Sequence, residues 1–272
     1  MGDGSSSIQL KRAMKQLPIT VSMISGAEAS RIGRALESVA GWTSEIIVVL
    51  NEDVKDDTEA IARRFGARVF LEPWKGYVAQ KASAAEKATQ EWVLGLDADE
   101  VVSPELRAEL ESLFTGKPGA PAFAACSFPR LTMFCGRWIR HGDWYPDRTT
   151  RLWRKNLAEW GGVDPHAKLL IQGEVRKLRG DLLHYNAESI DRQIAKISGF
   201  SSDFVRHQQA TGRRATWPDL VLRPAWRFVR SYFIRLGFLD GWQGWYIAWM
   251  TAFQTATRYA KVREAQAEPV QR

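Results

Sequence analysis

Two carboxylates separated by one small residue follow an apolar run near the middle of the chain. Asp97 and Asp99 come directly after residues 92–96, which are expected to form a buried strand that delivers both acids to its carboxyl end. Open α/β sheets bind ligands at that end, and paired hard oxygens suit a divalent cation that also holds a diphosphate. The alternative is an acidic turn before a helix, because Ser103 can cap a helix beginning at Pro104. Asp-x-Asp triplets are common by chance, so the surrounding elements must decide.

Strands and helices are expected to alternate over the first hundred residues. Apolar, β-rich runs predict the strands, and the segments between them have helical spacing. Right-handed crossovers would then place the loops after the strands along one rim of a doubly wound α/β sheet. Asp53, in the loop after the second strand, would share a cleft there with Asp99. The expected strands are 19–24, 45–50, 67–71, 92–96 and 123–131, with an edge strand over 151–154, and the expected helices are 32–39, 58–65, 80–88 and one from 104.

Length and charge narrow the class of protein. A chain of 272 residues exceeds the usual single domain, which predicts one large domain with a smaller appended module. Hydrophobic residues make up 45% and charged residues 25%, an ordinary globular composition. The formal net charge of +7 favours an anionic partner: nucleic acid, an anionic membrane surface or a phosphorylated substrate.

Cysteine usage and the first residues indicate a cytoplasmic address. Cys126 and Cys135 are too few for a disulfide scaffold or a cysteine-built zinc site, and they suit a reducing compartment. Residues 1–7 are polar and rich in glycine and serine, with no apolar segment typical of a secretory signal. We expect residues 1–16 to be a flexible N-terminus. The four histidines lack H-E-x-x-H spacing, which disfavours a histidine-built zinc site.

The order of these motifs resembles the inverting, GT-A-fold glycosyltransferases of family 2, and among them the lipopolysaccharide core β-glucosyltransferase branch. The resemblance covers roughly residues 17–263 and includes E-I-I-V-V, G-A-x-V-F, E-P-W-K-G, L-D-A-D-E, Y-P-D and R-L-W-R. Two motifs differ. Residues 25–28 are S-G-A-E where the family usually has T-x-N-E, and residues 50–53 are L-N-E-D where it usually has D-S-G-S-x-D. These positions touch the nucleotide in the family, so the donor is left open.

The resemblance implies roles for residues 17–115 as the nucleotide-sugar-binding half. Asp99 would hold Mg²⁺ or Mn²⁺ against the diphosphate of the donor, implied to be UDP-glucose, while Asp97 would face the ribose or a metal-bound water. The resemblance implies contacts to the donor at Glu28, Asp53, Gln80 and Lys81. For the two acids and the lysine, the alternative is a solvated surface side chain.

Residues 116–188 would form the acceptor-binding half and supply the base. A single displacement with inversion needs a carboxylate that takes the proton of the attacking hydroxyl. Asp164 is preferred, because it lies near the family's V-H-E position in a glycine-rich loop over 161–168; a residue that only fixes the turn is the alternative. His166 is placed to tune Asp164 and is a further candidate metal ligand. The candidate bases are Asp164, Asp147 and Asp143.

The chain from residue 189 onward is expected to be helical and basic. Arg223, Arg227 and Arg230 recur at helical spacing beside an apolar stripe that includes Trp226. The apolar run over 242–256 is shorter than the roughly 20 residues needed to span a bilayer. We therefore expect a helical, amphipathic module over 189–272 that lies on the inner, anionic face of the cell membrane. The alternative is an ordinary helical module packed against the catalytic domain.

The sequence thus predicts a metal-assisted, inverting glycosyltransferase that moves a hexose to a lipopolysaccharide core or another cell-surface glycan. A sugar nucleotidyltransferase is one rival, but it would usually need a glycine-rich, basic phosphate loop where this chain has S-G-A-E. A non-catalytic basic module that binds membranes or nucleic acid is the other. No helix-turn-helix, zinc-finger or RNP signature supports nucleic acid as a partner.

Overall fold

In the computed structural model of the protein, the described residues are 16–115, 122–164, 166–185, 190–191, 193–194, 204–205, 208 and 214–267. The side chains of Thr115 and His166 are not described. The N-terminus that we expected to be flexible lies outside these residues except for Gln16, as does the loop over 116–121. The chain divides into two compact units, one made of Met1–Pro129 with Arg148–Leu182 and the other of Arg130–Asp147 with Leu183–Arg272.

A mixed β-sheet is the main feature of the fold. Its strands are β1 (Leu17–Ser25), β2 (Thr43–Asn51), β3 (Arg68–Glu72), β4 (Trp92–Gly95), β5 (Glu100–Val102), β6 (Ala125–Phe134), β7 (Arg137–Ile139), β8 (Asp147–Arg154), β11 (Val175–Lys177) and β12 (Leu182–His184). They are arranged in the order β3-β2-β1-β4-β8-β6-β12-β5, with β7 and β11 paired to β6. The first four strands pair in parallel, and β4 pairs with β8 antiparallel. The predicted α/β sheet is confirmed, and the antiparallel strands make it a mixed one.

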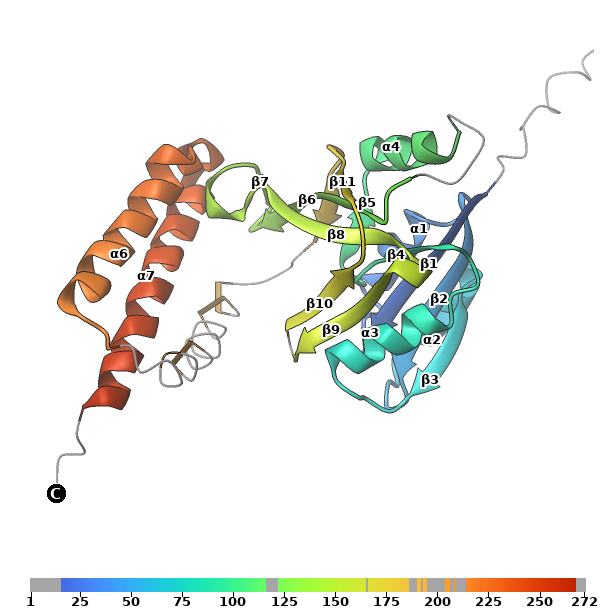
Figure 1. Ribbon diagram of the computed structural model, residues 1–272, viewed down its shortest axis with the longest axis horizontal. Coiled ribbons are helices and arrows are strands. Elements are labelled where there is room, and N and C mark those ends of the chain that lie inside the picture. Colours follow the sequence, from blue (N-terminus) through green and yellow to red (C-terminus); the bar gives the residue numbers. More distant parts are fainter. Residues whose placement is uncertain are drawn as a thin grey trace, which may run out of the picture. The chain divides into compact units, whose positions relative to one another are not determined.

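Helices follow the parallel strands and cover them. They are α1 (Ile32–Glu37), α2 (Thr58–Arg64), α3 (Tyr77–Glu86) and α4 (Pro104–Thr115). Helix α3 lies alongside β1 and β2 and contacts both (Figure 1). Ile19, Val21 and Val48 are fully buried, as expected of parallel strands that are covered on both faces.

The acidic pair lies between a strand and a capped helix. Strand β4 ends at Gly95, and α4 begins at Pro104. The backbone amide of Leu106 donates to Oγ of Ser103 at 3.1 Å, so Ser103 caps α4 as predicted. Leu106 and Leu110 pack in the main core. The acidic segment therefore leads into a helix and also follows a buried strand.

Two predicted elements differ in type from those that the structure contains. Residues 151–154 are not an edge strand, because β8 lies between β4 and β6 and buries Leu152 and Trp153. Residues 161–168 are not an open loop but belong to a hairpin of β9 (Ala158–Val163) and β10 (His166–Ile171). The glycines suggested a turn, yet Gly161 lies within β9, where a Cβ atom would come within 2.8 Å of Leu170.

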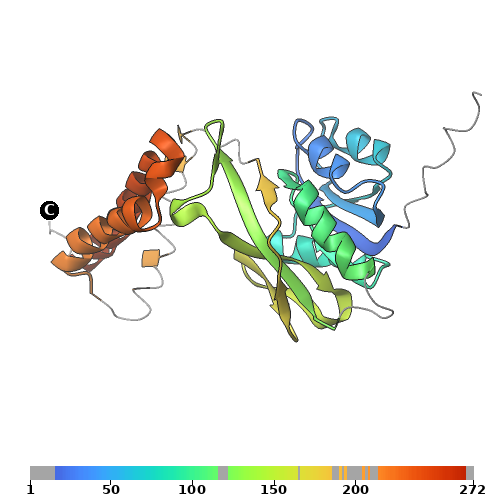
Figure 2. The ribbon, with the colours of Figure 1, turned by 90° about the horizontal axis from the view of Figure 1, so that it is seen from above.

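The second unit contains an antiparallel pair of helices. Helix α6 (Trp217–Val229) is joined to α7 (Gly241–Gln266) through the π-helical turn η3 (Arg230–Ile234) and the 3₁₀ turn η4 (Gly237–Asp240). Figures 1 and 2 show α6 and α7 side by side. Helix α6 begins with a capping box, in which the amide of Thr216 donates to Asp219 at 3.0 Å. Among the residues described, no helix offers an apolar stretch long enough to cross a bilayer.

A segment inserted between β6 and β8 completes this unit. It contains β7 and the 3₁₀ turn η1 (Gly142–Trp144). Asp240 is 2% exposed and accepts hydrogen bonds from the backbone amides of Arg140 and His141 at 3.0 and 2.7 Å. Buried acceptors that satisfy backbone donors are costly to remove. Asp240 therefore fastens the inserted segment to the start of α7.

Gly244 of α7 allows a close approach that no other residue permits. A Cβ atom at this position would overlap the carbonyl oxygen of Gly237 in η4. We expect Gly244→Ala to lower the free energy of unfolding by about 1–3 kcal/mol through overpacking, measured by thermal unfolding followed by circular dichroism. Gly33→Ala in α1 is the matched control, since its Cβ would make an ordinary 3.6 Å contact with Ile61. There the better helix propensity should stabilise the protein by up to about 1 kcal/mol. Equal stabilisation by both substitutions would contradict the packing described for η4.

Candidate active site

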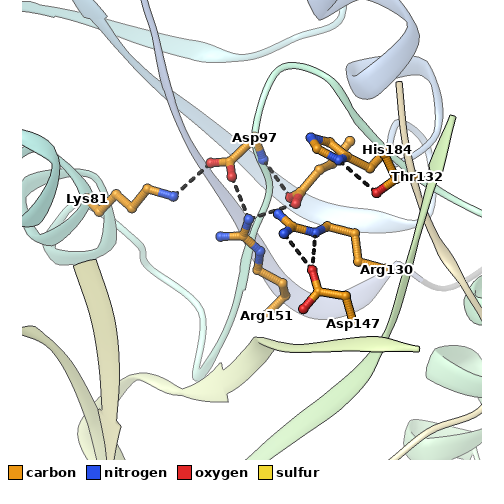
Figure 3. Close-up of polar contacts among 8 residues, drawn as sticks. Lys81, Asp97, Arg130, Thr132, Asp147, Arg151 and His184 are labelled. Carbon is orange, nitrogen blue, oxygen red and sulfur yellow. Dashed lines mark hydrogen bonds and ion pairs between the residues drawn. The ribbon is translucent and has the colours of Figure 1, made fainter. Parts of the chain in front are cut away.

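A buried arginine joins the first acid of the pair to a second carboxylate. Arg151 of β8 is 8% exposed along its side chain, and its Nη2 donates to Oδ2 of Asp97 at 2.5 Å and to Oε1 of Glu100 at 2.7 Å (Figure 3). Glu100 is fully buried, and its other oxygen accepts the backbone amide of Asp97 at 3.1 Å. The loop after β4 is therefore held by one buried charge network.

Lys81 of α3 supplies the second cation. Its Nζ donates to Oδ1 of Asp97 at 2.8 Å (Figure 3). The same Nζ lies 5.1 Å from the centre of the Trp160 ring. Burial alone would raise the pKa of the Asp97 carboxyl, but the charges of Arg151 and Lys81 outweigh it and hold the pKa well below its usual range. About a third of the Asp97 side chain, 34%, is exposed, so solvent screens part of this attraction.

These side chains line a small open depression in the first unit. Its lining includes Ser22 and Ile24 of β1, Lys81, Asp97, Arg151 and Trp160 of β9. The depression is open to solvent and has room for about one water molecule, so it is far smaller than most small-molecule sites. It would hold one part of a larger ligand. Two cations next to an ionised aspartate at the carboxyl ends of β1 and β4 suit an anionic part such as a diphosphate.

The loop after β1 is tied to the second acid of the pair. Arg31 donates to both carboxylate oxygens of Glu28 at 2.7 and 2.8 Å, and its Nη1 lies 3.8 Å from Oδ2 of Asp99. Asp99 is 24% exposed along its side chain. Two predicted site residues, Glu28 and Asp99, are thus brought together by an arginine to which the sequence assigned no role.

The loop after β2 makes its contacts through Asp56 and not through the predicted Asp53. Asp53 is exposed. Asp56 accepts hydrogen bonds from the hydroxyl and amide of Thr58 at 2.5 and 3.1 Å, and from the amide of Ala29 at 3.1 Å. The hydrogen bond from the Thr58 hydroxyl is the main cause of the lowered pKa of Asp56. These bonds join the loops after β1 and β2, and a nucleotide contact at Asp53 stays a prediction.

Helix α3 carries two predicted donor contacts of different character. Lys81 joins the Asp97 network, whereas Gln80 is fully buried and its Oε1 accepts the amide of Lys75 at 3.3 Å. Within the described structure, Nε2 of Gln80 is buried without a hydrogen-bond partner. Lys81 has a side chain that is only 15% exposed and is paired with Asp97, so the solvated-surface alternative is wrong for this lysine.

Asp164 caps helix α3 from the turn of the β9–β10 hairpin. Its Oδ1 accepts the backbone amide of Val78 at 2.9 Å, one of the amides that a helix N-terminus leaves unpaired. Gly76, just before α3, has φ of +90°, and a Cβ atom there would overlap the Asp164 carboxylate. The glycine of E-P-W-K-G is thus required both for its positive φ and for the space that the Asp164 carboxylate occupies. The bond from Val78 to Asp164 also joins the hairpin that carries Trp160 to the helix that carries Lys81.

The other two candidate bases, Asp143 and Asp147, belong to the second unit. Asp143 is 9% exposed and is surrounded by arginines, while Asp147 accepts two bonds from Arg130 at 2.6 and 3.0 Å through Oδ2 (Figure 3). His184, in the same unit, lies with Nδ1 3.2 Å from the Thr132 hydroxyl. The side chain of His166 lies outside the described residues, so its suggested roles stay predictions.

Arg151, Glu100 and Trp160 are the site residues that sequence reasoning missed. The first two lie in the motifs R-L-W-R and L-D-A-D-E, which were noted without a role for either residue. Neither residue stands out in the sequence, because β8 contains three other charged residues and Glu100 follows two other acids. Trp160 does not stand out either, since the chain has 12 tryptophans.

The chain is similar in sequence to known glycosyltransferases. A family model described as glycosyl transferase family 2 matches residues 20–173. An uncharacterized glycosyltransferase of Rickettsia prowazekii (strain Madrid E) is 32% identical over 261 residues, which cover 90% of this chain and 87% of that protein. The lipopolysaccharide core biosynthesis glycosyltransferase LpsC of Rhizobium meliloti (strain 1021) is 27% identical over 259 residues, covering 90% and 94%. Among solved structures, S. aureus TarS 1–349 in complex with UDP-GlcNAc is similar with a TM-score of 0.47 and 12% identity, covering 91% of each chain.

The family match and the Rickettsia relative identify the class of protein as a glycosyltransferase. The chain belongs to glycosyltransferase family 2. Its mixed α/β sheet with C-terminal helices confirms the GT-A architecture expected from the motifs. The coarse functional prediction, a glycosyltransferase that depends on a nucleotide sugar, is confirmed as well.

Glu72 at the end of β3 positions helix α3 and yields a test of the fold around the site. It accepts hydrogen bonds from Lys87, Lys75 and Ser83 at 2.5, 2.9 and 2.8 Å. Burial alone would raise its pKa, but these bonds outweigh burial and lower the pKa from 4.5 to about 2. The lowered pKa means that Glu72 stabilises the fold above pH 4.5, and that this contribution is lost as the pH falls through about 2.

We expect Glu72→Gln to lower the free energy of unfolding by about 2–3 kcal/mol at neutral pH. The difference from the wild type should shrink as the pH falls from 4.5 toward 2, because the wild-type carboxylate is protonated over that range. Thermal unfolding at a series of pH values measures this. Glu59→Gln on α2 is the control, since Glu59 forms an exposed pair with Arg63 and should cost less than about 1 kcal/mol. A Glu72→Gln difference that does not change with pH would contradict the ionic role of Glu72.

Proposed function

We propose that this enzyme moves a hexose, in the first instance glucose from UDP-glucose, to a lipopolysaccharide core or another cell-surface glycan with inversion at the anomeric carbon. The observation that carries the proposal is the pairing of Asp97 with Lys81 and Arg151 at the carboxyl end of β4. The acceptor class is supported by the 27% identity to LpsC, which extends over 94% of that protein. Release of UDP from a panel of UDP-hexoses, with purified core oligosaccharide as the acceptor, tests the donor and the acceptor together.

Within this proposal, the cations of the depression receive the donor's diphosphate. The network of Asp97, Glu100, Lys81 and Arg151 has two negative and two positive charges, so an arriving diphosphate must redistribute its pairs. Lys81 is the cation suited to move, because its ammonium is a point charge on a flexible stem. Arg151 is held from two sides and would keep the Asp97 loop in place.

A divalent ion fits this site through Asp99. Its carboxylate is partly exposed, and Mg²⁺ or Mn²⁺ takes one or two carboxylates together with phosphate oxygens and waters. Both oxygens of Asp97 already accept hydrogen bonds from cations, which disfavours Asp97 as a ligand. In the part of the chain that the structure describes, no three His, Cys, Asp or Glu side chains are grouped to hold a metal. When bound, the ion would neutralise charge on the departing diphosphate.

The base proposed is Asp164, which belongs to the same unit as the Asp97 network. The hairpin that carries it also carries Trp160, which lines the depression. Asp143 and Asp147 each form ion pairs with arginines, which occupy their carboxylates. Asp164 instead accepts a hydrogen bond from a neutral backbone amide of α3 through Oδ1.

We expect Asp99→Asn to weaken UDP-glucose binding in the presence of Mn²⁺ by about 10–100-fold, because the diphosphate would lose a charge-assisted bridge. Calorimetric titration with and without MnCl₂ measures the affinity. Asp57→Asn is the matched control: it removes the same charge from an exposed residue that precedes α2 and makes no side-chain capping bond there. Asp97→Asn should weaken binding less than Asp99→Asn. Donor binding that needs no metal and survives Asp99→Asn would refute the metal assignment.

We expect Asp164→Asn to leave donor affinity unchanged and to lower the transfer rate by about 10²–10⁴, the usual contribution of a general base. Asparagine keeps an oxygen that can accept the Val78 amide, so the cap of α3 is preserved. Single-turnover measurement of sugar transfer isolates the chemical step. Asp164→Ala is the comparison, since it removes both the base and the cap and should also lower the melting temperature. Turnover of Asp164→Asn at the wild-type rate would move the search to Asp147 and then to Asp143.

A further inference from the structure

The helical pair of the second unit exposes a concentration of large apolar side chains. Of the 20 exposed large hydrophobic residues in the described chain, 14 lie between Trp217 and Phe253, which we call the apolar surface. Single exposed hydrophobic residues are normal on soluble proteins. A concentration on one pair of helices instead marks an interaction surface.

On helix α7 the apolar surface is an ordered stripe. Trp242, Trp245, Trp249 and Phe253 follow one another at intervals of three or four residues and are 47–56% exposed. This spacing places them on one face of the helix. The other face is used for packing, where Ile247 is buried among the aromatic side chains of the second unit.

The stripe continues onto the preceding helix. The rings of Trp245 and Trp249 are 6.2 Å apart, and Trp249 lies 5.1 Å from Phe228 of α6. Trp226 on α6 is 56% exposed, and Phe233 in η3 is 55% exposed. Tryptophan is enriched where one side of a ring meets hydrocarbon and the other meets water.

An arginine cluster with excess positive charge lies at the end of α6. Arg227, Arg230 and Arg235 face the single carboxylate of Asp143 at 3.5, 3.0 and 3.4 Å. Asp143 is 9% exposed along its side chain, whereas the three arginines are 29–41% exposed. Three guanidinium groups around one carboxylate leave positive charge directed at solvent. Guanidinium groups are suited to bind phosphate.

We propose that the apolar surface and the arginine cluster dock this enzyme on a bilayer that contains anionic lipids. The aromatic side chains would enter the interfacial region of the bilayer while the arginine cluster binds lipid phosphates, as amphipathic helices lying in a membrane plane do. Charge favours this occupant over a second copy of the chain. Residues 214–267 contain eight basic and three acidic side chains, so two copies joined through this surface would repel each other. The inference does not depend on the donor, the acceptor or the metal.

The primary experiment uses the full chain without substitutions. Sedimentation with vesicles of phosphatidylcholine alone is compared with vesicles of equal parts phosphatidylcholine and phosphatidylglycerol, at low and high salt. We expect strong binding to the anionic vesicles, weak binding to the neutral ones, and a loss of binding on adding salt. Lipids brominated in their acyl chains should quench the tryptophan fluorescence of the bound protein.

The apolar contribution is tested with Trp245→Ser and Phe253→Ser combined. Both side chains are about half exposed, so the substitutions remove apolar area that the fold does not bury. We expect the partition coefficient onto anionic vesicles to fall about tenfold or more. Leu71→Ser with Trp74→Ser in the first unit is the matched control, since these residues are 53% and 49% exposed. The control should bind vesicles as the wild type does.

The charge contribution is tested with Arg227→Gln and Arg235→Gln combined. Arg230 remains to pair with Asp143, so the buried carboxylate keeps a partner. Loss of two charges should weaken binding to anionic vesicles about 30-fold and leave binding to neutral vesicles almost unchanged. Arg63→Gln with Arg64→Gln on α2 removes two exposed charges from the first unit and should have little effect.

Three results would overturn the proposal. One is a wild-type protein that ignores anionic vesicles at low salt. Another is unchanged vesicle binding by both substituted proteins, each verified as folded by circular dichroism. The third is a concentration-dependent dimer in sedimentation velocity that the Trp245→Ser, Phe253→Ser protein loses while vesicle binding is absent, which would assign the surface to a second copy.

Discussion

The site depends on the placement of one buried positive charge. Arg151 on β8 reaches Asp97 and Glu100, and Glu100 has no exposure to solvent at all. Burying charge is costly unless each member has partners, and removing one member of a buried pair commonly costs about 3–5 kcal/mol. The pairing therefore fixes β8 beside β4 and holds the loop after β4 in one conformation. The backbone amide of Asp97 bonds to Glu100 as well, so the position of the acid is determined from both the main chain and the side chain.

Helix α3 is the second determinant, and it is held at three points. Glu72 accepts hydrogen bonds from Lys75 just before the helix and from Ser83 and Lys87 at its end. Asp164 caps its first turn, and Lys81 reaches the acid after β4 from its middle. Each contact is polar and directional, so the helix has little freedom to slide along the sheet. Lys81 is thus positioned by contacts that come from three separate strands or loops.

The sequence was sufficient for the parts of the fold that depend on local pattern. The apolar runs at β1, β2 and β4, and the capping serine at Ser103, predicted those elements correctly because burial and capping leave a local signature. The contacts that build the site have no such signature. Arg151 and Asp97 are 54 residues apart, and Asp164 and Val78 are 86 apart. The prediction at Gly161 was wrong because the sequence does not distinguish a glycine needed for close cross-strand packing from a glycine needed for a turn.

The inserted segment over 130–147 has a consequence for how the C-terminal helices must be regarded. Its buried Phe134 and Ile139 pack with Ile247 of α7, and it is further bound to the helices through Asp143 and Asp240. The helices therefore share one hydrophobic core with the inserted segment and do not form an independent module. Truncation of the chain before α6 would expose that core to solvent and leave the Asp143 carboxylate without its arginine partners. For the same reason, evolutionary change at Arg230 should be accompanied by change at Asp143, although 87 residues separate them in the chain.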